Sequence, residues 1–147
     1  MNKFVKSHGL GNDYMVLDSR DLGFDLNSAA IKLLCHRNYG LGSDGILLLV
    51  PSDSADFGLR IFNPDGSEAE KSGNGLRIFA KYLYEHCHPQ SAAFRIDTPG
   101  GIVTAELEIK DGRAPYVTVE MGEATFTSSL IPVSGDEREV VGERIGV

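Results

Sequence analysis

The order of apolar and polar residues divides the chain into short strands and two helices. Alternating or continuous apolar stretches, bounded by turn residues, predict strands at residues 3–7, 14–19, 46–50, 57–62, 92–98, 102–109 and 116–121. Residues 26–38 have apolar positions at helical spacing, and Asn27 is placed to cap the first turn of that helix. After residue 125 the pattern weakens and the chain becomes polar.

The stretch from residue 73 to residue 86 predicts a second helix with an unusual distribution of side chains. Its charged residues, Arg77, Lys81 and Glu85, lie four positions apart and therefore occupy one narrow stripe. Apolar residues cover most of the remaining circumference, and a helix of this kind is buried on nearly all sides. In a chain of 147 residues we expect a curved sheet to bury it. The predicted fold is α+β, with a curved, mostly antiparallel sheet wrapped around a central helix.

Composition and charge limit the classes of function. The chain has 41% hydrophobic residues, enough for one core, and its net charge of −7 argues against a nucleic-acid partner. We find no signal-peptide pattern and no apolar run of about 18 residues, so we predict a cytoplasmic protein without membrane contact. The two cysteines, Cys35 and Cys87, are too few for a disulfide framework or a zinc site of their own.

A glycine-rich turn, Ser72-Gly73-Asn74-Gly75, opens directly into the second predicted helix. The first turn of a helix carries unpaired N–H groups and the positive end of the helix dipole. Glycines allow the carboxylate or phosphate of a ligand to approach that backbone, so the turn could hold an anion. Alternatively, Ser72 or Asn74 only caps the helix and the glycines only shape the turn. The local sequence leaves both interpretations open.

The other glycine-rich turns do not form a nucleotide-binding fingerprint. The segment "GLGSDG" precedes a strand, opens no helix and lacks the Lys-Ser/Thr pair of a phosphate-binding loop. Taken together, the motifs resemble those of the diaminopimelate epimerase family over roughly residues 3–122. They are "KSHGLGNDYMVLD" from Lys6, "YGLGSDGILLL" from Tyr39, "RIFNPDGSEAEKSGNGLRIFAKYL" from Arg60 and "VTVEMG" from Val117.

The resemblance implies a cofactor-independent enzyme that inverts an α-carbon of diaminopimelate, in lysine and cell-wall precursor synthesis. Family members have two pseudo-symmetric domains, each with a sheet around a central helix. The substrate lies in the cleft between the two helix N-termini. One cysteine removes the α-proton and a second cysteine delivers a proton to the opposite face. The resemblance also implies that no metal is needed, and a tendency to form homodimers.

By the same resemblance, the substrate contacts fall on Asn12, Asn63, Gly73 and Asn74. Side-chain amides and helix N–H groups suit the carboxylate and amine of an amino acid. They can also stabilise the charge that builds on the carboxylate as the α-proton leaves. Asn12 and Asn63 could instead serve only their own turns. Some family members have a glutamine where this chain has Gly45, so no contact is carried over there.

Ser72 occupies the position of the family's first catalytic cysteine. A thiol has a pKa of about 8.5, which a helix N-terminus lowers, whereas a serine hydroxyl is far less acidic. Ser72 is therefore not expected to act as a resting base, although it could donate or relay a proton. Cys87 lies roughly 21 Å further along the predicted helix and cannot replace the missing thiol. We expect Cys35 to belong to the core and His8 to have a structural role.

Family members are about twice as long as this chain, and the second catalytic cysteine has no counterpart in it. We therefore predict an epimerase-like N-terminal domain over residues 1–122. Residues 123–147 are predicted to be the start of a truncated second domain, partly disordered or swapped. Such a chain is expected to be inactive alone. Two alternatives stay open: a dehydratase-type relative in which Ser72 donates a proton, and a non-catalytic module that binds a carboxylate.

Overall fold

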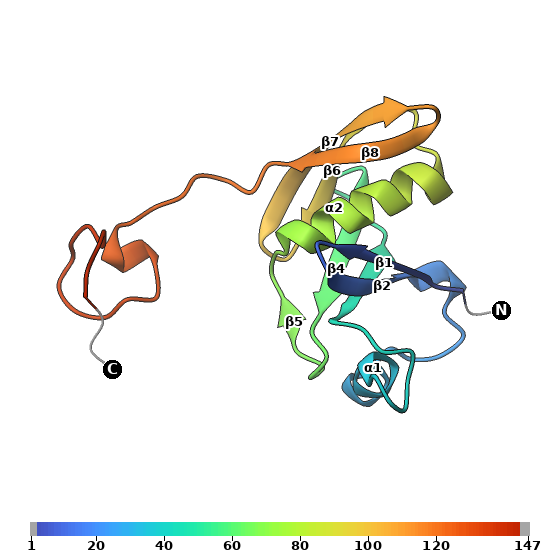
Figure 1. Ribbon diagram of the computed structural model, residues 1–147, viewed down its shortest axis with the longest axis horizontal. Coiled ribbons are helices and arrows are strands. Elements are labelled where there is room, and N and C mark those ends of the chain that lie inside the picture. Colours follow the sequence, from blue (N-terminus) through green and yellow to red (C-terminus); the bar gives the residue numbers. More distant parts are fainter. Residues whose placement is uncertain (1–2, 145–147) are drawn as a thin grey trace.

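The computed structural model describes residues 3–144, which form a mixed sheet around a central helix (Figure 1). The strands are hydrogen-bonded in the order β1-β2-β3-β4-β6-β7-β8, and β5 pairs with β4. Within the described residues, β2–β3 and β4–β6 are the parallel pairs, so the sheet is mostly antiparallel, as predicted. The strands are β1 Val5–Gly9, β2 Asn12–Asp18, β3 Ile46–Val50, β4 Phe57–Phe62, β5 Glu68–Ala69, β6 Ala93–Thr98, β7 Gly101–Lys110 and β8 Arg113–Val119.

Two helices provide the long connections that parallel strand pairs require. Helix α1, Ser28–Cys35, connects β2 to β3, and its N-cap is Asn27, as predicted. Helix α2, Gly73–Tyr82, lies between β5 and β6 in the chain. Figure 1 shows α2 lying along the sheet, with β1 on one side of it and β8 on the other. The sheet and α2 together form a half-barrel with a central helix.

Strand β2 shows how both faces of the sheet become buried. Its side chains alternate, so that Tyr14 and Val16 join the cluster around α2, whereas Met15 and Leu17 join the cluster around α1. All four are buried. A strand covered on both faces has an almost continuous apolar sequence, and this explains the uninterrupted "YMVL" in this part of the chain.

The burial of α2 confirms the prediction made from its apolar surface. Leu76, Phe79 and Ala80 are fully buried, and the helix contacts β1, β2, β7 and β8. The charged stripe keeps partial access to solvent, and Lys81 pairs with Glu85 at 3.6 Å. The sheet therefore encloses α2 on its apolar sides and leaves its charged stripe at the surface.

The first strand and the turn after it differ from the sequence prediction. Strand β1 begins at Val5 instead of Lys3, and the turn shrinks from residues 8–13 to Leu10 and Gly11. Both turn residues have positive φ angles, 55° and 89°, as a two-residue hairpin requires. A leucine in this conformation is unusual, so no residue pattern in this segment predicts such a tight turn. Asn12, predicted in the turn, is the first residue of β2.

Two further element ends also differ from the predictions. The helix expected to run to His86 is α-helical only to Tyr82 and continues as a π-helical turn from Leu83 to Cys87. Strand β8 covers residues 113–119 instead of 116–121. Met121 therefore lies beyond the sheet, where 42% of it is exposed.

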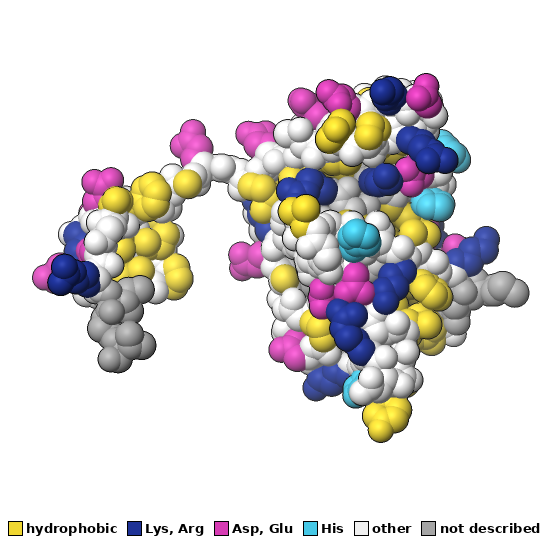
Figure 2. Space-filling model, viewed as in Figure 1, with side chains coloured by type: hydrophobic (Ala, Val, Ile, Leu, Met, Phe, Trp, Pro, Cys, Tyr) yellow, Lys and Arg dark blue, Asp and Glu magenta, His cyan; other side chains and the backbone are white. Residues whose placement is uncertain are grey.

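After β8 the chain leaves the sheet through an exposed stretch and forms a small lobe (Figure 1). In that lobe Thr127 bridges to Glu139, and the buried Ser128 donates its N–H to the carbonyl of Arg138. Figure 2 shows hydrophobic side chains gathered on this lobe. In the lobe, Phe126 is 54% exposed and Leu130 is 71% exposed.

Candidate functional site

Ser72 is the N-cap of α2. Its extended backbone precedes the helix, and its hydroxyl oxygen accepts the N–H of Gly75 at 3.0 Å. Ser72 therefore caps the helix, as one of the two interpretations of this turn predicted. The same oxygen lies 3.3 Å from the hydroxyl of Tyr14, which reaches it from β2. Ser72 thus has a second polar partner, and a proton can be shared between the two hydroxyl groups.

The two glycines that follow Ser72 have different surroundings. Apart from its chain neighbours and the backbone of its own helix, a Cβ atom added to Gly73 would meet no atom within 4 Å, so no other part of the described chain fills the space above this residue. A Cβ atom on Gly75 would lie 3.0 Å from Leu47 and 3.1 Å from Ser72. Gly75 is therefore needed for close packing between α2 and β3, whereas Gly73 leaves the first turn of the helix accessible to a ligand.

Side-chain amides line this helix start. Asn74 donates from Nδ2 to Oδ1 of Asn12 at 3.3 Å, and Asn12 donates from its own Nδ2 to the Asp44 carboxylate at 3.1 Å. On the other side, Arg77 donates to Oδ1 of Asn74. The structure therefore brings together Asn12, Ser72, Gly73 and Asn74, four of the five residues predicted for the site.

Charged groups surround the amides on the side of the loop between α1 and β3. Arg37 pairs with Asp13 and with Asp44, at 2.7 Å in each case, and Lys6 pairs with Asp13 at 3.1 Å. The hydrogen bond from Arg37 is the main reason that the pKa of Asp13 is lowered to about 2. The pKa of Asp44 is also lowered, mainly by the hydrogen bond from Asn12. Both carboxyl groups are therefore ionised at neutral pH.

Asn63 lies apart from this network within the described part of the chain. Its Nδ2 donates to the Ser67 hydroxyl at 3.0 Å, and its backbone N–H donates to the Ser67 carbonyl at 2.8 Å. The interpretation of Asn63 as a turn residue accounts for these contacts. At Gly45, an added Cβ would lie 2.5 Å from the carbonyl oxygen of Phe62. No side chain fits at residue 45 unless the neighbouring strand moves.

The remaining candidate residues do not add a reactive group. His8 is exposed on β1, and Cys35 is buried in the cluster around α1, as predicted. Burial raises the pKa of the Cys35 thiol. Among residues 3–144 no group of three or more His, Cys, Asp or Glu side chains is placed to hold a metal ion. No helix in this range has the length and apolar character to cross a membrane.

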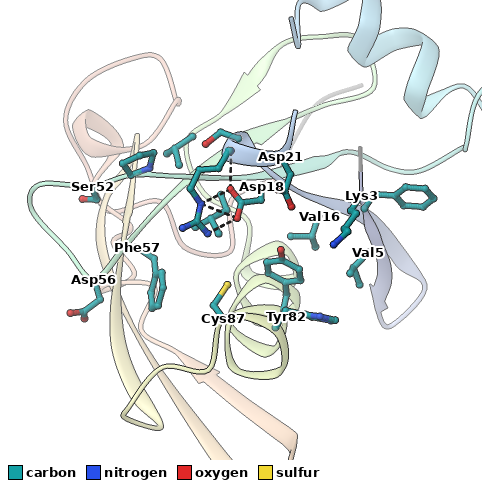
Figure 3. A pocket seen from close by; sticks show the side chains of 17 residues that line it. Lys3, Val5, Val16, Asp18, Asp21, Ser52, Asp56, Phe57, Tyr82 and Cys87 are labelled. Atoms are coloured by element: carbon teal, nitrogen blue, oxygen red, sulfur yellow. Dashed lines mark hydrogen bonds and ion pairs between the residues drawn. The ribbon is translucent and has the colours of Figure 1, made fainter. Parts of the chain in front are cut away.

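A cavity of about 690 Å³ lies at the opposite end of the central helix. In Figure 3, Tyr82 and Cys87 face it from the helix, and the ion pair between Asp18 and Arg20 borders it. Burial raises the pKa of the Cys87 thiol, so this thiol is protonated at neutral pH. Cys87 sits at the last turn of the helix and Ser72 at its first, so the cavity shares no residue with the amide-lined site.

Sequence reasoning missed four residues of the amide-lined site: Tyr14, Arg37, Asp44 and Arg77. Tyr14 reads as a core residue of β2, and Arg77 as part of the solvent-facing stripe of α2. Asp44 lies in a motif that was recognised, but its contact with Asn12 joins residues 32 positions apart. No local pattern signals such a contact.

The overall fold resembles that of solved isomerase structures. A hydroxyproline epimerase from Agrobacterium vitis, solved with bound trans-4-hydroxy-L-proline, superposes with a TM-score of 0.65 at 18% identity. The match covers 80% of this chain and 40% of that structure. At this level of identity the likeness concerns the fold alone. The class that the fold defines is therefore that of half-barrel domains with a central helix.

Sequence comparison identifies the family. A profile of the diaminopimelate epimerase family matches residues 4–127. The chain is 57% identical to diaminopimelate epimerase 2 of Nostoc sp. over 144 residues, and 45% identical to diaminopimelate epimerase of Pelotomaculum thermopropionicum over 143 residues. It spans about half the length of these relatives, 50% and 51% respectively. This chain belongs to the diaminopimelate epimerase family.

Proposed function

We propose that this chain forms one wall of an amino-acid epimerase cleft and holds the carboxylate of diaminopimelate at the N-terminus of α2. The observation that carries the proposal is the open space above Gly73. Gly73 is the first residue of α2, and the amides of Asn12 and Asn74 are hydrogen-bonded to each other at this helix start. These groups are mainly hydrogen-bond donors, and a carboxylate is a pure acceptor.

The same donors suit the chemistry of inversion at an α-carbon. When a base removes the α-proton, the electrons of the broken C–H bond spread onto the carboxylate and increase its negative charge. Helix N–H groups and fixed amides stabilise that charge without having to reorganise. A proton delivered to the opposite face of the carbon then completes the inversion. Asn63 is proposed as a further substrate contact. Only the family resemblance supports this contact, because Asn63 lies outside the hydrogen-bonded network of Asn12 and Asn74.

A two-base reaction needs a proton-transferring group on each side of the α-carbon. Ser72 can donate a proton or relay one through Tyr14. It is not a resting base, because a serine hydroxyl is too weak an acid to be deprotonated at neutral pH. We therefore propose that this chain alone does not invert diaminopimelate. Residues from 123 on are proposed to begin a second domain, because their exposed apolar side chains, such as Phe126 and Leu130, need a packing partner.

The hydrogen bond between Ser72 and Tyr14 also supports a second candidate, a dehydratase-type activity. In that reaction a base on the partner domain would remove the α-proton of an amino acid that carries a β-hydroxyl group, and the Cβ–O bond would break. Ser72 would give the departing hydroxide a proton, which forms water, and would take a proton back from Tyr14. The two candidates differ in what they do to the α-proton of an amino acid. With a partner domain present, exchange of the α-proton in only one stereoisomer would support the one-sided mechanism.

The test is a titration of the ¹⁵N-labelled chain with diaminopimelate, followed by amide NMR and by α-proton exchange in D₂O. We expect the backbone N–H signals of Gly73 and Asn74 to shift without measurable inversion. The Gly73→Ala variant should melt at the same temperature or higher and lose the shift, because the added methyl group fills the ligand space. Unchanged Gly73 and Asn74 signals would refute the site. If this chain alone inverted diaminopimelate above the background rate, the proposed need for a second domain would be refuted.

A further inference from the structure

We propose that Arg37 and Asp44 are positioning residues that fix the direction of the side-chain amides of Asn12 and Asn74. They are joined to the amides by a continuous chain of hydrogen bonds that runs from the loop between α1 and β3 to the first turns of α2. That these amides bind a substrate rests on the proposed function. That Arg37 and Asp44 fix their direction rests only on the hydrogen bonds described above.

The chain of hydrogen bonds can run in one direction only, because both of its ends are charged. The Asp44 carboxylate only accepts hydrogen bonds, so the Asn12 group that faces it must be the NH₂ group. The carbonyl oxygen of Asn12 then faces Asn74 and requires an NH₂ group there. The remaining carbonyl oxygen of Asn74 faces Arg77, whose guanidinium group only donates.

Arg37 holds Asp44 in place for this task. It bridges Asp44 and Asp13, which neighbours Asn12 in the chain, with contacts of 2.7 Å. The second carboxylate oxygen of Asp44 accepts the backbone N–H of Asp13 at 3.1 Å, beside the contact with Asn12. The backbone N–H of Asp44 donates to the carbonyl of Asp13 at 2.8 Å. Asp44 is therefore fixed to the start of β2 through side chain and backbone together.

The direction of the hydrogen bonds decides which group of each asparagine amide is left to face a ligand. Each side-chain NH₂ group donates one N–H within the chain of hydrogen bonds, and its other N–H stays available for a ligand. With Asp44 uncharged, Asn12 could turn over and present its carbonyl oxygen, which repels a carboxylate. Arg37 and Asp44 thus set the site to favour an anionic group, although both lie in a loop outside the helix start itself.

The direct test follows the side-chain NH₂ signals of Asn12 and Asn74 in the ¹⁵N-labelled chain without ligand. Asp44→Asn keeps the shape of residue 44 and removes its charge, and Arg37→Ala removes the bridge. Arg37→Lys keeps a positive charge that can contact both carboxylates. The matched control is Arg20→Ala, which removes another exposed arginine, paired with Asp18 at the other end of the half-barrel.

We expect Asp44→Asn and Arg37→Ala to shift the NH₂ signals of both asparagines and to speed their hydrogen exchange. Arg37→Lys should restore them, and Arg20→Ala should leave them unchanged. A purely structural role for Arg37 would lower the melting temperature and leave the NH₂ signals in place. Signals that do not respond, or a response confined to Asn12, would overturn the proposal.

A second measurement adds diaminopimelate to the same variants. We expect binding to weaken by about tenfold to a hundredfold in Asp44→Asn and Arg37→Ala, as when residues that orient the ligands of a metal site are replaced. If the unmodified chain does not bind diaminopimelate, the proposed function fails. The NH₂ signals still decide on the positioning role. If binding is present and the two variants bind as well as the unmodified chain, the amide direction has no role in recognition.

Discussion

Replacing Ser72 with cysteine would place a thiol at the start of α2, where the helix dipole and two hydrogen-bonding groups act on it. The Ser72 oxygen accepts the Gly75 N–H at 3.0 Å and lies 3.3 Å from the Tyr14 hydroxyl. Both neighbours can donate a hydrogen bond to a thiolate. We therefore expect the thiol introduced by Ser72→Cys to have a pKa below the value of an ordinary cysteine.

The size of this effect follows from the energy of a charge at a helix N-terminus. That interaction is worth about 0.5–2 kcal/mol, and one pKa unit corresponds to about 1.36 kcal/mol. The thiol pKa should fall from about 8.5 to between roughly 7 and 8. At pH 7 the thiolate fraction would rise from about 3% to between roughly 10% and 50%.

The assay is the pH dependence of alkylation by iodoacetamide, with each site identified by peptide mass spectrometry. Cys35 and Cys87 serve as internal controls, because burial raises the pKa of both thiols and they should react slowly at pH 7. Adding Tyr14→Phe to Ser72→Cys should raise the pKa again by several tenths of a unit, because one donor is lost. A thiol at residue 72 that titrates at or above 8.5 would refute the reasoning about this helix start.

Other substitutions test separate parts of the structure. Gly75→Ala should destabilise the fold by about 1–3 kcal/mol in urea unfolding, because its methyl group overpacks the core, whereas Gly73→Ala should not destabilise it. Phe79→Ala should cost about 3–5 kcal/mol in the same measurement, since Phe79 is fully buried; a loss below about 1 kcal/mol would contradict the central position of α2. The folded-state pKa of Asp13 is lowered from 3.8 to about 2, so its ion pair stabilises the fold above pH 4 and this stabilisation is lost as the pH falls through about 2. Arg37→Ala should therefore move acid unfolding, followed by circular dichroism, to higher pH, and an unchanged midpoint would argue against the ion pair.

The main features of the fold could be predicted because they depend on local patterns. The nearly continuous apolar surface of α2 required a sheet around it, and Asn27 marked the start of α1. Strands β3 and β4 matched their apolar segments at both ends, since Gly45 and Pro51 bound the first segment and the polar residues Asp56 and Asn63 bound the second. In contrast, Leu10 has a positive φ angle, which leucine rarely adopts, and the strand predicted from Lys3 begins only at Val5.

The site could be predicted only in part, for a physical reason. The motif around Gly73 is local, so its position at the helix start was visible in the sequence. The groups that act on it come from β2 and from the loop before β3: Tyr14 lies 58 positions from Ser72, and Asn12 lies 62 positions from Asn74. Hydrogen bonds over such separations depend on strand register and loop path, which a single sequence does not specify.

The enclosure of α2 by strands from both ends of the domain has a consequence for how the chain folds. The helix contacts β1, which begins at Val5, and β8, which ends at Val119. During synthesis its apolar surface therefore stays uncovered until nearly all of the domain has left the ribosome. Contacts this distant in sequence are slow to form, because the chain must first close large loops. Folding of this half-barrel is thus expected to be a late, cooperative event, in which the first and last strands close over a helix made midway between them.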